Sequence, residues 1–227
     1  MTNIRHFDME IAELKRSLAT MGDLVERTVG VAVKAILHPV VEAREQARVY
    51  EDQLDKLDSE IEDKCHQILA LQAPMAKDMR LLVTSMRVAI DLESIGDLAE
   101  SLAKRASWIA RHTMVPIPAT FTPLSQVVIG MVHGAIEAFI SGNIDLARQV
   151  IADEDRADAL TKQGYGELKI QIRADGERLD EHVHLLRAIA HLEQIADVAV
   201  SIAEEAVYIE KGMLIRHHHE HLDGGPT

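Results

Sequence analysis

The fold is decided by a stretch that the chain carries twice: residues 92–106 read LESIGDLAESLAKRA, and residues 192–206 read LEQIADVAVSIAEEA. Eight of these 15 aligned positions are identical at a shift of 100 residues. In both copies the apolar residues recur every three or four positions, which is typical of a helix that packs one face into a core. A repeat of this kind predicts two structurally equivalent units along the chain.

Earlier parts of the two halves also align, at a shift of 103 residues. AVKAI at 32–36 falls on AIEAF at 135–139, and the acidic pattern that begins at Glu51 falls on the one that begins at Glu154. The change from 103 to 100 requires a small deletion between the second and third helices, where a surface turn absorbs it easily. We therefore infer two tandem three-helix units.

The composition favours long helices. Aromatic residues make up only 3% of the chain while apolar residues make up 47%, so the core must be built from Leu, Ile, Val, Ala and Met. Such a core suits helices better than sheets. Only six prolines and 12 glycines interrupt the pattern, and they are bunched. The apolar periodicity predicts helices over residues 4–38, 40–71, 75–111, 124–140, 144–173 and 177–211.

A proline-rich segment divides the halves. Residues 112–123 read HTMVPIPATFTP, hold three prolines and have no helical period, so we interpret them as a linker. Gly142, Asn143 and Gly212 have the residue types that end or begin helices. The predicted fold is all-α, with six long helices forming two tandem three-helix bundles related by a pseudo-twofold repeat. The bundles span residues 1–112 and 123–212, and a flexible His-rich tail follows at 213–227.

Charge and cysteine content narrow the class of partner. Lys and Arg number 24 and Asp and Glu number 37, which gives a net charge of −13. This argues against nucleic acid as a partner, because nucleic-acid binding depends on Lys and Arg that neutralise phosphates.

The single cysteine, Cys65, forms no intrachain disulfide and favours a reducing compartment. We see no signal segment and no apolar stretch near the roughly 18–20 residues that span a bilayer. We therefore expect a cytoplasmic protein without direct membrane insertion, peripheral at most through protein partners.

Four Glu-x-x-x-Asp pairs stand at repeat-equivalent positions. A spacing of four places both carboxylates on one face of a helix, with Cβ atoms about 5–6 Å apart. Like charges at this spacing destabilise a helix by a few tenths of a kcal/mol, so their repetition suggests that something offsets the repulsion. The pairs are Glu51/Asp55, Glu93/Asp97, Glu154/Asp158 and Glu193/Asp197.

Helix lengths predict that the pairs of each half meet. If the turns lie near Ala73 and Asp175, both pairs of a half lie about 30 Å from their turn, at a rise of about 1.5 Å per residue. Each half then gathers four carboxylates at one level of a bundle. Carboxylates are hard oxygen ligands suited to magnesium, calcium, manganese or iron, with zinc also possible. We predict metal sites at these eight residues; a solvated acidic face remains the alternative.

Other sequence patterns are weaker evidence for a functional site. Glu181 and His184 have the spacing of a di-iron ligand pair, but the first half has no equivalent. Arg87 and Arg187 align in the repeat. They could pair with the carboxylates or bind an anion, and a plain salt bridge is the default interpretation. We find no Gly-rich phosphate loop, no Ser/His/Asp order and no dinucleotide fingerprint. We therefore expect no catalytic residues and no enzyme activity.

At these residues the sequence resembles the PhoU family, and the resemblance spans nearly the whole chain. The Leu92–Ala99 stretch (LESIGDLA) is similar to the family signature in the third helix, and Leu192–Asp197 (LEQIAD) is a second copy in which Ala196 stands in place of the usual glycine. Further similar segments are the Phe7-to-Gly22 opening, residues 61–80 around the turn after the second helix, and the closing Ile215–His217.

The resemblance implies two three-helix bundles with metal ions at the Glu-x-x-x-Asp motifs, which map onto the eight residues above. It also implies a cytoplasmic regulator that restrains phosphate uptake and represses the phosphate-starvation response. In this role the protein links the phosphate transporter ATPase to a sensor histidine kinase, and homodimers are common. The rival hypothesis is a carboxylate-bridged metal-storing or di-iron helical protein. A third is a purely structural helical protein whose acidic pairs are solvated.

Overall fold

A computed structural model of the chain describes residues 2–72, 74–112 and 115–212, with side chains from residue 6 on. In these ranges the chain forms six long α-helices and one short 3-10 helix, and no strand, which confirms the all-α prediction. The tail at 213–227 and the closing Ile215–His217 lie outside the described residues. The elements are α1 (Thr2–Leu37), α2 (Ala43–Gln72), α3 (Lys77–Ile109), α4 (Phe121–Ser141), α5 (Ile144–Ala174), η1 (Gly176–Arg178) and α6 (Leu179–Lys211).

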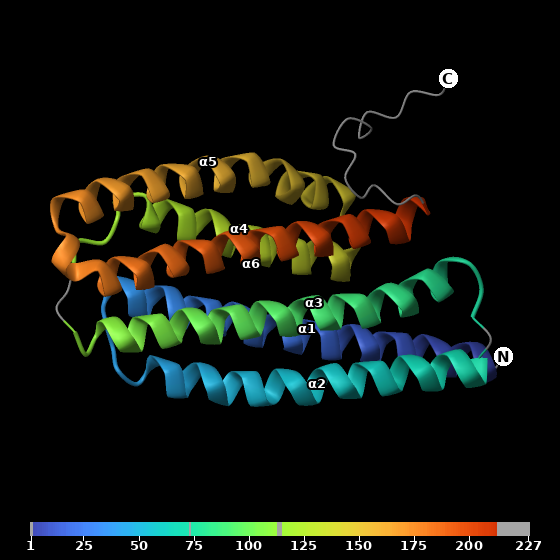
Figure 1. Cartoon of the computed structure of the whole chain (residues 1–227). Helices are drawn as coiled ribbons and strands as arrows, with labels where there is room; N and C mark the ends of the chain where they lie inside the picture. The colour runs from blue at the N-terminus through green and yellow to red at the C-terminus, as the bar shows by residue number, and fades with distance from the viewer. Residues whose placement is uncertain (1, 73, 113–114, 213–227) are drawn as a thin grey trace, which may run out of the picture.

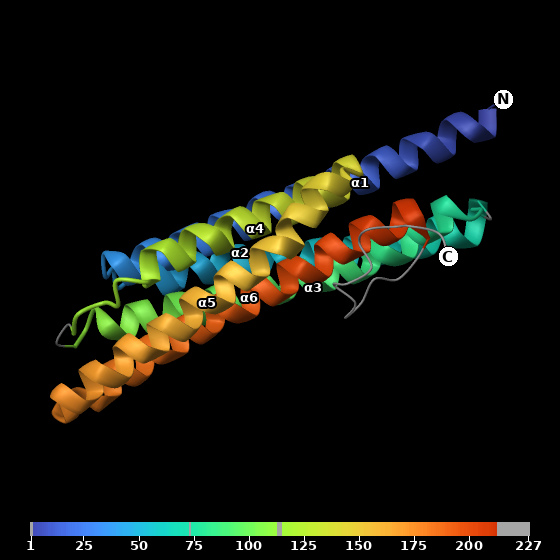
Figure 2. The same ribbon diagram turned by 90° about the horizontal axis from the view of Figure 1, so that it is seen from above.

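The helices form two triplets that pack side by side. Helices α1, α2 and α3 contact one another, and so do α4, α5 and α6. The α2–α3 turn and the α5–α6 turn lie at opposite ends of the molecule (Figures 1 and 2). Contacts of α3 with α6 and of α1 with α4 join the triplets. This arrangement agrees with the predicted pair of bundles related by a pseudo-twofold repeat.

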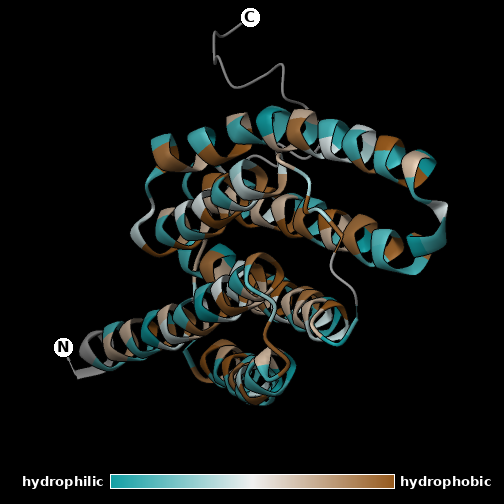
Figure 3. Cartoon of the chain, turned by 90° about the vertical axis from the view of Figure 1, so that its left-hand side faces the viewer, coloured by the Kyte–Doolittle hydropathy of each residue, from teal (hydrophilic) through white to brown (hydrophobic). Residues whose placement is uncertain are grey.

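The two triplets share one hydrophobic core. Buried apolar side chains from all six helices belong to a single cluster, from Leu14 and Leu54 in the first half to Phe121 and Ile195 in the second. Hydrophobic and hydrophilic residues alternate along every helix (Figure 3), as expected where one face is buried and the other solvated. Cys65 is fully buried in this core, where burial raises the pKa of its thiol to about 12.

Three helix ends follow the predicted capping chemistry. Gly142 ends α4 and Gly212 ends α6, with φ of 73° and 68°, a left-handed conformation that glycine adopts without a steric penalty. The side chain of Asn143 accepts a hydrogen bond of 3.1 Å from the backbone N–H of Leu146, which caps α5. The α4–α5 turn is therefore encoded locally.

Several helix starts differ from the predicted positions. Helix α3 begins at Lys77 because the preceding Ala76 has φ of 40°, so Pro74 belongs to the turn and not to the helix. Helix α4 begins earlier than predicted, at Phe121, with Pro123 inside its first turn. A proline is tolerated there because the first N–H groups of a helix have no partner within the helix. Helix α2 begins at Ala43, and a 3-10 turn precedes α6.

Helix α4 corrects an expectation about membrane spans. Among the helices that the structure describes, α4 is the one long and apolar enough to cross a membrane by length and composition, so the expectation that no such stretch exists was wrong by that measure. However, 61% of its apolar window is buried inside the protein. A core helix that is covered on most sides by α1, α5 and α6 has the same composition.

Helices α2 and α3 pack tightly against each other at Gly96. A Cβ atom on Gly96 would lie 2.4 Å from Cδ1 of Leu54, which is fully buried, so a larger residue at 96 would force this leucine side chain to shift. In the second half, Ala196 takes the place of Gly96 and the smaller Ala157 takes the place of Leu54. The equivalent helix contact is therefore made by a large and a small residue in the first half and by two alanines in the second.

This packing predicts an interaction between Leu54 and Gly96 in stability. Gly96→Ala should lower the free energy of unfolding by about 1 kcal/mol, because overpacking costs about 1–3 kcal/mol while alanine returns about 1 kcal/mol of helix propensity. Leu54→Ala alone should cost about 2–5 kcal/mol. In the double variant, which reproduces the Ala/Ala pair of the second half, the loss should be at least about 1 kcal/mol smaller than the sum of the two single losses. Urea unfolding measures all three, and simple additivity would contradict the contact.

Candidate functional site

The first-half carboxylates lie on neighbouring helices. Glu51 and Asp55 are on α2, and Glu93 and Asp97 are on α3; the two aspartates are exposed and the two glutamates are partly buried. Asp55 and Asp97 directly follow Leu54 and Gly96, two residues that pack against each other between α2 and α3. The close approach therefore brings the two acidic pairs to the same level.

The first-half carboxylates are electrostatically coupled across the two helices. Burial raises the pKa of Glu51, and the negative charges of Asp55 and then Asp97 raise it further. Burial likewise raises the pKa of Glu93, followed by the charges of Asp97 and Asp55. The pKa of Asp97 is raised by burial and by Asp55 on the opposite helix. These couplings cross from α2 to α3, as the helix-length argument predicted.

A fifth carboxylate, which the sequence analysis missed, extends this group. Asp58 lies one turn after Asp55 on α2, and its charge helps to raise the pKa of Glu93. Its own pKa is raised by burial and by Glu62 and Asp55. Its repeat counterpart is Thr161, so a search for acids present in both halves passed over it. We call Glu51, Asp55, Asp58, Glu93 and Asp97 the first acidic group.

In the second half one carboxylate is coupled to another across two helices. Glu154 and Asp158 are on α5, and Glu193 and Asp197 are on α6. Burial raises the pKa of Asp197, and Glu193 and Asp158 raise it further. We call these four residues the second acidic group.

A tyrosine distinguishes the second acidic group from the first. The hydroxyl of Tyr165 donates a hydrogen bond of 3.0 Å to Glu193, and burial followed by this carboxylate raises the pKa of Tyr165 to about 12. Part of the second group's hydrogen-bonding capacity is therefore already satisfied inside the protein. The repeat alone predicts no such difference between the halves.

The first acidic group offers the oxygen ligands that a hard cation prefers, but its side chains are not arranged to coordinate one. Among the described residues, none of its carboxylates forms an ion pair with a Lys, Arg or His side chain. However, within residues 2–72, 74–112 and 115–212 no three His, Cys, Asp or Glu side chains lie close enough together to hold a metal ion. A bound cation would require rotation of the exposed Asp55 and Asp97 side chains, and metal binding stays a prediction.

Two other candidate residues lie away from the carboxylates. Nη1 of Arg87 pairs with Oε1 of Glu205 at 3.2 Å, which joins α3 to α6 and confirms the default salt bridge for Arg87. Arg187 forms no ion pair among the described residues, so the same expectation was wrong for it. The ring of His184 stacks on Trp108, with centroids 3.8 Å apart and planes at 13°. His184 therefore belongs to the α3–α6 contact, and its position does not support the di-iron alternative. The tail histidines at 217–219 and 221 lie outside the described residues.

Comparison with known proteins relates both halves to one family. A family model described as the PhoU domain matches residues 18–106 and again 121–206. The chain is 31% identical to the phosphate-specific transport system accessory protein PhoU homolog of Pseudomonas aeruginosa over 214 residues, which cover 94% of this chain and 88% of that protein. It is 31% identical to the homolog of the same name from Aquifex aeolicus, over 92% of this chain and 95% of that protein.

Solved structures agree with these matches. The crystal structure of PhoU from Pseudomonas aeruginosa superimposes with a TM-score of 0.88 at 31% identity and covers 91% of this chain and 100% of that one. The crystal structure of the phosphate transport system regulatory protein PhoU from Streptococcus pneumoniae superimposes with a TM-score of 0.84 at 26% identity and covers 92% and 98% of the two chains. The predicted family resemblance is therefore confirmed.

Repulsion within the first acidic group predicts that neutralising one of its carboxylates stabilises the folded protein, and that this gain in stability depends on pH. In the presence of a chelator at pH 7, Asp97→Asn should raise the free energy of unfolding by about 0.5 kcal/mol and the melting temperature by about 1–2 °C. A raised native pKa means that the folded state takes up protons before the unfolded state does, so the wild type recovers this stability as the pH falls. The gain should be smaller at pH 4 than at pH 7, because protonation of these carboxylates in the folded state removes part of the repulsion.

Thermal melts of both proteins at pH 7 and pH 4 measure the effect. Asp23→Asn is the matched control, because it removes the same charge from an exposed position on α1. A gain from Asp97→Asn that is the same at both pH values would show that charge repulsion is not its cause.

Proposed function

This chain belongs to the PhoU family, and from that premise we propose that it serves a phosphate transport system as an accessory protein that restrains phosphate uptake and represses the phosphate-starvation response. The observation that carries the proposal is the double match of the family model together with relatives, named as transport accessory proteins, that align with almost the whole chain. The proposed role is regulatory and not catalytic.

We propose that the protein acts as an adaptor at the cytoplasmic face of the membrane, between the transporter ATPase and a sensor histidine kinase. An adaptor must present two surfaces in a fixed relation. Here the shared core and the α3–α6 contact hold the two halves together, and Arg80 adds hydrogen bonds of 3.2 and 3.3 Å to the carbonyl oxygen of Ile209. An ion pair of 2.7 Å between Lys77 and Glu210 lies beside them. Homodimer formation is part of the same proposal.

We further propose that iron, zinc, magnesium or manganese ions bind the two acidic groups. A cation supplies positive charge that offsets the mutual repulsion of the carboxylates and ties α2 to α3 and α5 to α6. In the first group Glu51 and Asp55 approach from α2, and Glu93 and Asp97 approach from α3. Occupancy of these groups would stiffen the scaffold and so influence how it contacts its partners.

The regulatory role predicts a simple phenotype. Deletion of the gene should leave alkaline phosphatase expression high in phosphate-rich medium, because the starvation response is no longer repressed. A plasmid copy of the wild-type gene should restore repression, and an empty plasmid is the control. Enzyme assays on cells grown with excess and with limiting phosphate measure the effect. Repression that persists in the deletion strain would contradict the proposed function.

Metal binding predicts a ligand-dependent gain in stability. If a cation is present at about 100 times its dissociation constant, it stabilises the folded state by about 2.7 kcal/mol, which raises the melting temperature by roughly 5–10 °C for a chain of this size. Chelator-treated protein should show this shift with at least one of manganese, magnesium, zinc and ferrous iron. In the variant Glu51→Gln/Asp97→Asn the shift should fall substantially, because one ligand is lost from each helix.

The Asp23→Asn control should respond to metal as the wild type does. Elemental analysis after dialysis provides an independent measure of bound metal. The metal part of the proposal fails if no cation shifts the wild-type melting temperature, or if the double variant responds as strongly as the wild type.

A further inference from the structure

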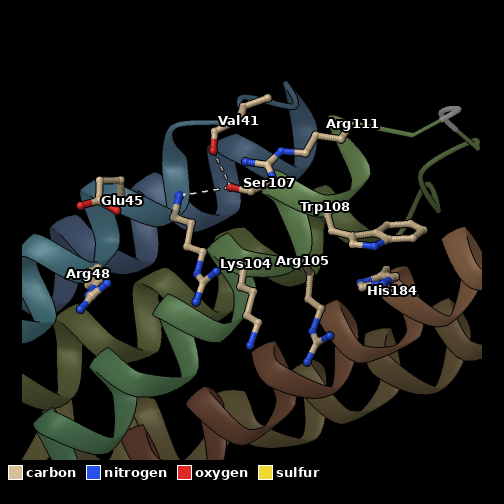
Figure 4. A pocket seen from close by; sticks show the side chains of 10 residues that line it. Val41, Glu45, Arg48, Lys104, Arg105, Ser107, Trp108, Arg111 and His184 are labelled. Carbon is tan, nitrogen blue, oxygen red and sulfur yellow. Dashed lines mark hydrogen bonds between the residues drawn. The ribbon is translucent and has the colours of Figure 1, made fainter.

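A basic pocket lies where α2 begins, α3 ends and α6 begins (Figure 4). Its volume of about 420 Å³ falls within the range of small-molecule sites. Although the chain as a whole carries a net charge of −13, this pocket has a single acidic residue, Glu45, in its lining. The positively charged and imidazole side chains that line it are Arg44, Arg48, Lys104, Arg105, Arg111 and His184.

Comparison of the two repeats shows that two positive charges at this end of the α3–α6 contact stand where the other end has an ion pair. Helices α3 and α6 run antiparallel, and Arg87 on α3 pairs with Glu205 on α6. A shift of 100 residues converts this pair into Arg187 on α6 and Arg105 on α3, so the pseudo-symmetric position holds two guanidinium groups. The whole dipeptide is reversed in charge, because Lys104-Arg105 stands where the other copy has Glu204-Glu205.

Arg105 is in an electrostatically unfavourable environment as a result of this change. Burial lowers its pKa, and the positive charge of Arg187 lowers it further, while Glu100 partly offsets both. Its Nε atom is buried and has no hydrogen-bond partner among the described residues. A desolvated guanidinium donor without an acceptor is unfavourable, and a bound anion would satisfy it.

Most of the pocket's cations have no internal counterion. Arg44 pairs with Glu100 at 3.2 Å. In the described part of the chain, Arg48, Lys104 and Arg111 form no ion pair. Figure 4 shows Lys104 and Arg105 extending side by side from α3, with Arg48 on the α2 side of the pocket. The site therefore offers several separated positive charges, which match an anion with more than one charged group.

The walls of the pocket are held in place. The hydroxyl of Ser107 donates to the carbonyl oxygen of Val41 at 2.9 Å and accepts from the backbone N–H of Arg44 at 3.2 Å, which ties the start of α2 to the end of α3. Trp108 is stacked between His112 and His184, at centroid distances of 3.7 and 3.8 Å. Because both faces of the indole are covered, recognition at this pocket rests on charge and not on stacking of a base.

We propose that this pocket binds a small anion that carries two or more phosphate groups, either inorganic polyphosphate or the phosphate chain of a nucleotide. Guanidinium groups match phosphate oxygens with paired hydrogen bonds, which a lysine alone cannot do. The proposal rests on the pocket alone and does not depend on the regulatory role proposed above.

Trp108 is the only tryptophan in the chain and lines the pocket, so its fluorescence reports on binding directly. Tripolyphosphate, pyrophosphate, ATP, AMP and orthophosphate are titrated into the full chain at low salt without magnesium, with calorimetry as the second readout. Tripolyphosphate and ATP should bind saturably and with affinities within about threefold of each other, since the base adds no stacking. Orthophosphate and AMP should bind at least about tenfold more weakly, because each offers one phosphate group.

Arg105→Glu provides the matched variant, since it recreates the Arg–Glu pair of the pseudo-symmetric position and should leave the fold intact. Its affinity for tripolyphosphate should fall by roughly tenfold to a hundredfold. Lys169→Glu makes the same change of charge on the exposed face of α5 and should bind as the wild type does.

The proposal is overturned if no anion with several phosphates binds saturably, or if Arg105→Glu binds as tightly as the wild type. It is also overturned if orthophosphate binds as tightly as tripolyphosphate, or if ATP binds while tripolyphosphate does not. Circular dichroism confirms that each variant is folded, so loss of binding in Arg105→Glu with retained helicity supports the pocket.

Discussion

The packing of α3 between α2 on one side and α6 on the other is the constraint on which the rest of the structure depends. Close approach to α2 at Gly96 brings the first acidic group together. Contact with α6 joins the two halves into one core and places Arg87 against Glu205. The end of the same helix supplies Lys104, Arg105 and Trp108 to the basic pocket. The first acidic group and the basic pocket are thus both consequences of where α3 lies.

The two halves share the same three-helix arrangement but differ in charge at the two ends of the α3–α6 contact. Along α3 and α6 many buried apolar positions repeat, and both halves contribute to the core. At one end of their contact an ion pair neutralises the interface, while the other end concentrates positive charge around Arg105. A duplicated scaffold can therefore carry two different binding chemistries, since surface charges change without cost to the packing that positions them.

Sequence reasoning succeeded where the signal is local or periodic. Six helices and the caps at Gly142, Asn143 and Gly212 followed from apolar spacing and residue chemistry, and the coupling of the first-half acidic pairs across α2 and α3 followed from helix length. It was wrong at the starts of α3 and α4, because backbone conformation at Ala76 and the tolerance of Pro123 in a first turn depend on context. Asp58 was missed because its counterpart in the repeat is not acidic.

By itself the sequence determined the helical class, the internal repeat and the family, since these depend on apolar periodicity and on motifs that survive along one chain. Only the tertiary structure decided that the two bundles share a core, that Leu54 needs Gly96, and that Arg105 faces Arg187. The physical reason is that packing and charge pairing involve residues far apart in the chain. Their distances are set by how the helices cross, which no local pattern records.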